Sequence, residues 1–137
     1  MECSRETEII LGDRVIHTKY QGDVECDFIL SAIEEWLGIL NERKDIGYLI
    51  FDYSSANMDG LGAEDAKKIA LSSDAVVRAN PEIKLIGVMP KDSDQKITGT
   101  WAAYSASGQG PTQFSNILIM NSLGEALDYV QEREAGK

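Results

Sequence analysis

The residues best suited to chemistry or recognition gather in one polar stretch, from Asp52 to Glu64. It combines side chains that donate or accept hydrogen bonds with glycines that permit tight turns. The stretch leads from an apolar run into a helical pattern beginning near Ala63, so a helix N-terminus would present its backbone N–H groups here. We predict a partner-binding loop made of Asp52, Ser54, Ser55, Asn57, Asp59, Gly60, Gly62 and Glu64.

More specific chemistries at this loop each lack part of their pattern. The four carboxylates between Asp52 and Asp65 could hold Mg²⁺ or Ca²⁺, but their spacing matches no EF-hand. Gly60-Leu61-Gly62 could cradle a phosphate, but it lacks the lysine and Ser/Thr of a P-loop. Capping and turn formation are the ordinary roles of such residues at a strand-to-helix junction. We therefore predict no metal, no cofactor and no catalytic residue.

The single histidine and the two cysteines show no catalytic or metal-binding pattern. A histidine that acts as a general base needs an orienting partner and a nucleophile, and we interpret His17 instead as a half-exposed structural residue of a strand. Cys3 and Cys26 form no Cys-x-x-Cys pair and have no histidine near them in the sequence. A zinc site is therefore not predicted.

A second candidate region lies in the third predicted helix and the loop after it. Trp101 and Tyr104 are three residues apart and would share one helix face. The segment from Gly108 to Gln113 has the composition of a loop. The aromatic pair would either pack against the sheet or anchor a partner. With Gln109, it would line an apolar ligand pocket under the alternative function described below.

Apolar patterning predicts the elements that position these residues. The unbroken run Tyr48–Phe51 indicates a central strand that is covered on both faces. Further strands are predicted near residues 8–11, 14–20, 83–89 and 117–120, and helices near 23–44, 63–79, 92–105 and 122–132. Gly12-Asp13 should join the first two strands as a hairpin, and Asp23 should cap the first helix. The later alternation of strands and helices predicts an α/β fold with a mixed sheet, mostly parallel, covered by about four helices.

Size and charge exclude some partners. A chain of 137 residues is expected to form one domain, 1–137. Its formal net charge of −10 would repel nucleic acids and anionic lipids. The first residues show no signal peptide, and no apolar run approaches the ~20 residues of a membrane span. We expect a cytoplasmic protein.

Several motifs together resemble the SpoIIAA-like branch of the STAS family, within the STAS/SEC14 superfamily. They are the element order, the strand ending in Asp52, the Pro-x-x-Lys-Leu-Ile-Gly-Val pattern at 81–88 and the Ser-x-x-Glu-Ala-Leu-x-Tyr-Val pattern at 122–130. Bacterial anti-sigma factor antagonists in this family carry Met-Asp-Ser-Ser-Gly-Leu-Gly in the loop after the central strand. Here residues 58–62 read Met-Asp-Gly-Leu-Gly, without the serine pair. The resemblance thus implies the fold and a regulatory loop without the usual phosphoserine switch, and phosphorylation of Ser54 or Ser55 stays open.

Three functions remain open at this stage. The favoured one is a non-enzymatic regulatory module that binds a protein partner, of the kinase or sigma-pathway type that the resemblance implies, through residues 54–67 and the segment around Asp92. The second is a domain that binds an apolar small molecule or lipid, since this branch is similar to the lipid-carrying CRAL-TRIO fold. The third is an enzyme that uses the carboxylates of Asp52 and Asp59. Self-association as a homodimer through the N-terminal hairpin edge is compatible with each of these.

Overall fold

The computed structural model describes residues 3–57, 63–88 and 117–136. The described elements are β1 (Ser4–Ile10), β2 (Val15–Asp23), α1 (Cys26–Glu42), β3 (Tyr48–Asn57), α2 (Ala63–Ala79), β4 (Lys84–Val88), β5 (Ile117–Met120) and α4 (Leu123–Ala135). All five predicted strands are confirmed, as are three of the predicted helices. The helix predicted at 92–105 lies outside the described residues.

The strands form one mixed sheet in the order β1-β2-β3-β4-β5. β1 pairs with β2 antiparallel as the predicted hairpin, and the remaining neighbours pair parallel. β3 is therefore the middle strand, and its residues from Tyr48 to Tyr53 are all buried. The prediction of a dry central strand is confirmed, because an apolar run without alternation needs cover on both faces.

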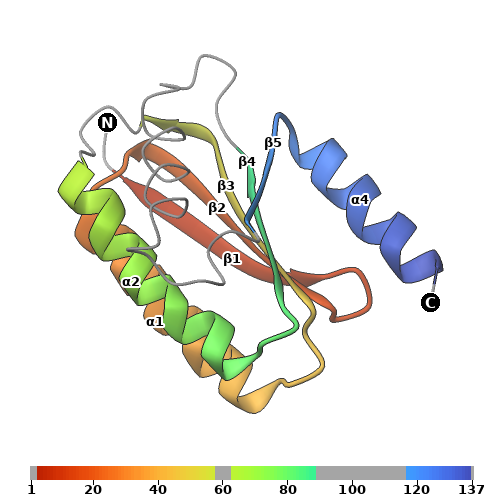
Figure 1. Ribbon diagram of the computed structural model, residues 1–137. Coiled ribbons are helices and arrows are strands. Elements are labelled where there is room, and N and C mark those ends of the chain that lie inside the picture. Colours follow the sequence, from red (N-terminus) through yellow and green to blue (C-terminus); the bar gives the residue numbers. More distant parts are fainter. Residues whose placement is uncertain (1–2, 58–62, 89–116, 137) are drawn as a thin grey trace.

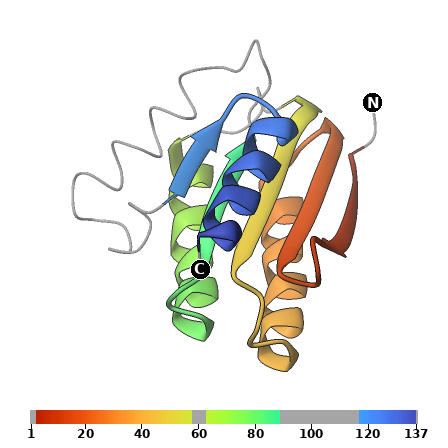
Figure 2. The same ribbon diagram turned by 90° about the vertical axis from the view of Figure 1, so that its right-hand side faces the viewer.

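Helices cover the two faces of this sheet (Figures 1 and 2). α1 and α2 lie side by side on one face, and α4 lies on the other. The core is correspondingly divided into two clusters of buried side chains. One joins α1 and α2 to Ile16, Leu49, Phe51 and their neighbours, and the other joins α4 to Val15, Tyr48 and Ile50. Alternate residues of each strand thus serve opposite faces, as the pleat requires.

A buried polar contact fixes α1 on the sheet. Trp36, from the apolar stripe of α1, donates its indole N–H to Thr18 Oγ1 on β2 at 2.8 Å. The Thr18 hydroxyl also lies 2.9 Å from Thr7 Oγ1 on β1. Both Thr18 and Trp36 are buried, so this contact satisfies polar atoms that water does not reach.

The hairpin turn between β1 and β2 uses three consecutive residues with positive φ. Leu11, Gly12 and Asp13 have φ values of 50°, 67° and 62°. Glycine reaches this region without the steric cost that a Cβ brings, which explains its place in the middle of the turn. Arg14 follows directly, and the predicted turn at Gly12-Asp13 is confirmed.

The boundaries of two elements differ from the predictions. β3 does not end at Asp52 but continues to Asn57, because the polar residues after Asp52 still pair with β2. α1 begins at Cys26 with Glu25 at the N-cap position, whereas Asp23 is the last residue of β2. The predicted N-cap role of Asp23 is therefore wrong. At α4, in contrast, Ser122 caps the helix as predicted, accepting the Glu125 N–H.

Candidate functional site

The carboxyl end of β3 carries the first candidate residues, and Asp52 is buried there. Only 1% of Asp52 is exposed. Its Oδ1 accepts the backbone N–H of Ser54 at 3.0 Å and the Ser54 hydroxyl at 2.6 Å. The expectation that Asp52 offers its carboxylate to a partner in an exposed loop is therefore wrong. The reason is that Asp52 still lies within the sheet, where its side chain is enclosed by neighbouring strands.

His17 on β2 completes the environment of Asp52. Its Nε2 lies 3.3 Å from Asp52 Oδ2, and its Nδ1 lies 3.4 Å from Glu8 Oε1 on β1. His17 is 6% exposed, so the expectation of a half-exposed histidine is wrong. A carboxylate beside each ring nitrogen favours the imidazolium form, in which both nitrogens donate hydrogen bonds.

Electrostatics in this chain of side chains favour the charged forms. The hydrogen bond with Asp52 raises the pKa of His17, and burial opposes it less strongly. Burial by itself would raise the pKa of Asp52, but the hydrogen bonds from His17 and Ser54 outweigh it and the pKa is lowered. Both shifts favour a charged pair, and the buried Asp52 carboxylate has contacts with His17, the Ser54 N–H and the Ser54 hydroxyl, which help such a pair to be tolerated.

The arrangement does not match a nucleophilic triad. In a triad the base accepts the proton of the nucleophile, whereas the Ser54 hydroxyl donates to Asp52 and not to His17. Among the described residues, no group of three His, Cys, Asp or Glu side chains is arranged to hold a metal ion. What this geometry does provide is a rigid connection between β1, β2 and β3 beneath the end of β3.

The residues that follow Asp52 reach the surface. Ser54, Ser55 and Asn57 are exposed, and Glu64 is exposed in the first turn of α2. Asn57 Nδ2 donates to Asp23 Oδ1 at 2.9 Å, which joins the ends of β3 and β2. A shallow cavity of about 390 Å³ lies here, lined by Asp23, Val24, Glu25, Cys26 and Asn57. The structure therefore places Ser54, Ser55 and Asn57 in the last residues of β3 and Glu64 in the first turn of α2, all of them exposed.

The remaining predicted site residues lie outside the described residues. These are Asp59, Gly60 and Gly62 of the loop, and Trp101, Tyr104 and Gln109 of the predicted ligand pocket. The hypothesis of an apolar pocket depends on the second group. It stays a prediction.

The part that sequence reasoning missed is the pairing of His17 with Asp52. The signal was present in the strand pattern, because β2 and β3 were both predicted. Thr18 pairs with Phe51 and Lys19 with Asp52 in the parallel register, which puts His17 and Asp52 on one face of the sheet. Strand neighbours and register cannot be read from a single sequence, so the contact between His17 and Asp52 is visible only in the tertiary structure.

The chain was compared with known proteins. No protein-family model matches it, and no curated protein matches its sequence. None of the described helices is long and apolar enough to cross a membrane.

One solved structure that is similar to this chain is that of the anti-sigma factor antagonist SpoIIAA in its unphosphorylated form. The superposition has a TM-score of 0.58 and covers 93% of this chain and 98% of SpoIIAA, with 12% sequence identity. At this identity the likeness concerns the fold alone. The chain has the SpoIIAA-like α/β fold, as the motifs predicted.

Proposed function

We propose that this protein is a non-enzymatic regulatory module that binds a protein partner through the carboxyl edge of its sheet. The proposed surface, called the β3 edge below, consists of Ser54, Ser55, Asn57 and Glu64. The observation that carries the proposal is the contrast within one strand between the buried, hydrogen-bonded Asp52 and the exposed polar residues directly after it.

The fold likeness supports this proposal in general terms. SpoIIAA is described as an anti-sigma factor antagonist, a protein that acts on another protein. In α/β sheets, binding sites usually form where the chain leaves the carboxyl ends of the strands, and the β3 edge lies at that place. The likeness supplies the fold alone, and the location of the proposed surface rests on the exposed residues at the end of β3.

The side chains beneath the β3 edge support a recognition role over a catalytic one. Ser54 is held by two hydrogen bonds to Asp52, and Asp52 is held by His17. A backbone held in this way loses little conformational freedom when a partner binds, which favours affinity. The His17 imidazole faces carboxylates at both nitrogens and has no described nucleophile to activate.

We propose further that the module works without a phosphoserine switch in the 58–62 loop. The segment has no serine. The strand before it contains Ser54 and Ser55, and the Oγ of Ser54 is 2.6 Å from the Asp52 carboxylate. A phosphate placed on this oxygen would face a buried negative charge, which disfavours the modified state.

Site-specific photo-crosslinking tests the proposed function. A photo-reactive amino acid is introduced at Ser55 and, as a matched control, at the exposed Glu132 on the outer side of α4, and each protein is produced in its native host. We expect one discrete crosslinked protein at position 55 that is absent at position 132. The double variant Ser55→Arg/Glu64→Arg should prevent capture of that protein, because it adds bulk and reverses charge at exposed sites.

Thermal unfolding of each variant tests whether the fold is intact. Both substituted residues are exposed, so the midpoint should stay within a few degrees of the parent protein. Equal capture at positions 55 and 132, or capture that survives the double variant, would refute the β3 edge as the binding surface.

A further inference from the structure

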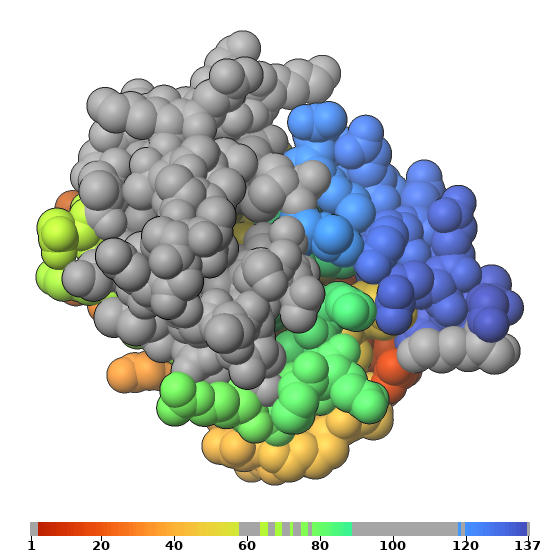
Figure 3. Space-filling view, viewed as in Figure 1, coloured from red at the N-terminus to blue at the C-terminus, as the bar shows by residue number. Residues whose placement is uncertain are grey.

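A second cavity lies at the opposite end of the strands, where β3 and β4 begin. It has a volume of about 470 Å³, within the range of ligand pockets. Its lining comes from the turn before β2, the α1–β3 and α2–β4 connections, the first residues of β3 and β4, and the last turn of α4. Figure 3 shows the surface between the green α2–β4 connection and blue α4 at this end of the molecule.

The charge of this cavity is opposite to that of the protein. Among the described residues, its lining includes the basic residues Arg14, Lys44, Lys84 and Arg133 and one acidic residue, Glu82. The chain as a whole carries 23 acidic residues against 13 basic ones. A concentration of positive charge in a concave site of an acidic protein attracts anions, since a cleft focuses the field of its lining charges.

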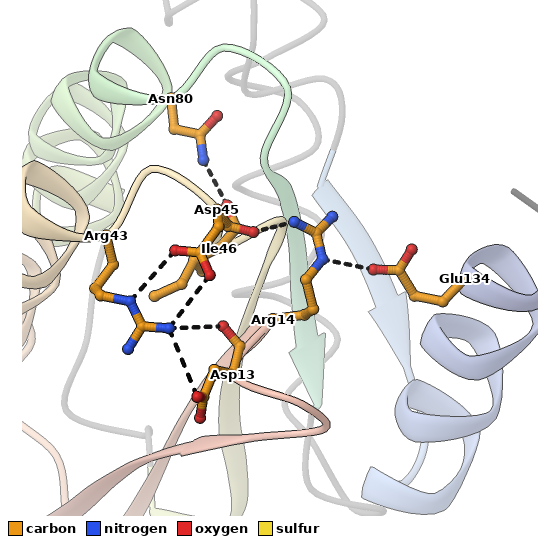
Figure 4. Close-up of polar contacts among 7 residues, drawn as sticks. All are labelled: Asp13, Arg14, Arg43, Asp45, Ile46, Asn80 and Glu134. Carbon is orange, nitrogen blue, oxygen red and sulfur yellow. Dashed lines mark hydrogen bonds and ion pairs between the residues drawn. The ribbon is translucent and has the colours of Figure 1, made fainter.

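Arg14 organises the wall of the cavity through several contacts with the protein. Arg14 Nε donates to Glu134 Oε1 on α4 at 2.7 Å, and its Nη1 donates to the Asp45 carbonyl (Figure 4). Asn80 Nδ2 donates to the neighbouring Ile46 carbonyl at 2.5 Å. Gly47 makes room for Arg14, because a Cβ at this position would lie 2.7 Å from its Nη2. These contacts fix the backbone of the α1–β3 connection.

The remaining cations belong to three separate elements. Lys44 precedes β3, Lys84 begins β4, and Arg133 lies in the last turn of α4. Arg133 is placed above the Tyr129 ring, with its guanidinium carbon 5.8 Å from the ring centre. An anion in the cavity would therefore be contacted from several sides.

A buried hydroxyl in the same cavity provides an independent observation. Tyr48 is 1% exposed, and within the described part of the chain its OH has no hydrogen-bond partner. An unpaired buried hydroxyl is unfavourable, so its presence calls for an explanation. The Arg133 guanidinium faces this hydroxyl without completing a hydrogen bond of ordinary geometry, and the interaction with the Tyr48 oxygen raises the pKa of Arg133. Tyr48 and Arg133 thus offer donors to the same space.

We propose that this cavity binds a small multivalent oxyanion, a phosphorylated or polycarboxylate molecule. Lys44, Lys84 and Arg133 would neutralise its charge, and the Tyr48 hydroxyl would donate to one of its oxygens. The bound anion would join the last turn of α4 to the starts of β3 and β4. The site is separate from the β3 edge, so it stands independently of the proposed function.

Calorimetry on the full chain tests the proposal with pyrophosphate and citrate as probes. We expect saturable binding of at least one of them, and the tighter of the two identifies the phosphate or carboxylate class. Lys44→Met/Lys84→Met should weaken binding at least tenfold. The control Lys19→Met/Lys68→Met, which removes the same charge elsewhere, should change the dissociation constant less than twofold.

Tyr48→Phe provides a second variant that does not depend on net charge. It should weaken binding severalfold while leaving the unliganded protein equally or more stable, because it removes an unpaired buried hydroxyl. Arg14→Met is not used, since Arg14 supports the wall of the cavity.

Thermal unfolding separates a bound anion from general screening of the −10 net charge. At ten times the dissociation constant, the anion should raise the midpoint by roughly 3–5 °C beyond NaCl of equal ionic strength. The proposal is overturned if neither probe binds, if NaCl stabilises equally, or if both lysine pairs weaken binding alike.

Discussion

His17 and Asp52 form a buried ion pair across β2 and β3, with Nε2 3.3 Å from Oδ2, although they are 35 positions apart in the chain. The pair lies beneath the exposed β3 edge and connects it to β1 through Glu8. Its two pKa shifts have opposite signs, and each links protonation to folding.

Stability should decrease as pH rises above neutrality. The folded pKa of His17 is raised above 6.5, so its contribution is complete below the unfolded value and is lost as pH rises through the folded one. The pKa of Asp52 is lowered from 3.8, so its contribution is present above that pH and is lost as pH falls through the folded value. Urea unfolding from pH 5 to 8.5 measures the decline.

His17 is the only histidine, so His17→Gln should flatten most of this slope. Stability that increases between pH 6 and 8, or an unchanged slope in the variant, would show that His17 is not protonated in the folded protein.

Removal of the Asp52 carboxylate should be costly. Asp52→Ala leaves a buried imidazole without its main partner and frees Ser54, and we expect a loss of about 3 kcal/mol in the free energy of unfolding. Asp52→Asn should lose less, because an amide still accepts a hydrogen bond. Glu6→Gln, at an exposed site on β1, is the control and should stay within about 0.5 kcal/mol. Equal effects at the two sites would contradict the ion pair.

The contact between Trp36 and Thr18 can be tested by a double-mutant cycle. Thr18→Val leaves the buried indole N–H unpaired, so we expect a loss of about 1–3 kcal/mol in urea unfolding. Thr18→Ser keeps the hydroxyl and should lose less. In the Trp36→Phe background, Thr18→Val should cost clearly less, and additive effects would show that the two side chains do not interact.

Two glycines should respond to alanine with opposite signs. Gly12 has a φ of +67° in the hairpin turn, so Gly12→Ala should destabilise by about 1 kcal/mol through backbone strain alone. Gly38 is exposed within α1 and has open space around it, so Gly38→Ala should stabilise by up to about 1 kcal/mol. Thermal unfolding measures both, and the same sign for the two variants would contradict the assigned backbone conformations.

Some features of this protein were determined by the sequence itself. The run Tyr48–Phe51 predicted the buried central strand, and the spacing of apolar residues in 26–40 predicted α1, because side-chain periodicity is a local property. The motifs at 81–88 and 122–130 resembled those of the SpoIIAA-like branch, and that resemblance implied the fold. The polarity of Ser54, Ser55 and Asn57 predicted their exposure, although these residues lie in β3 and not in a turn.

Only the tertiary structure decided what these elements place together. Asp52 was expected to face a partner, but strand pairing beyond it encloses its carboxylate and joins it to His17. The basic cavity draws Arg14 from the β1–β2 turn, Lys84 from β4 and Arg133 from α4. Such contacts depend on strand register and on where each connection returns to the sheet, and these are properties of the whole chain that local spacing does not encode.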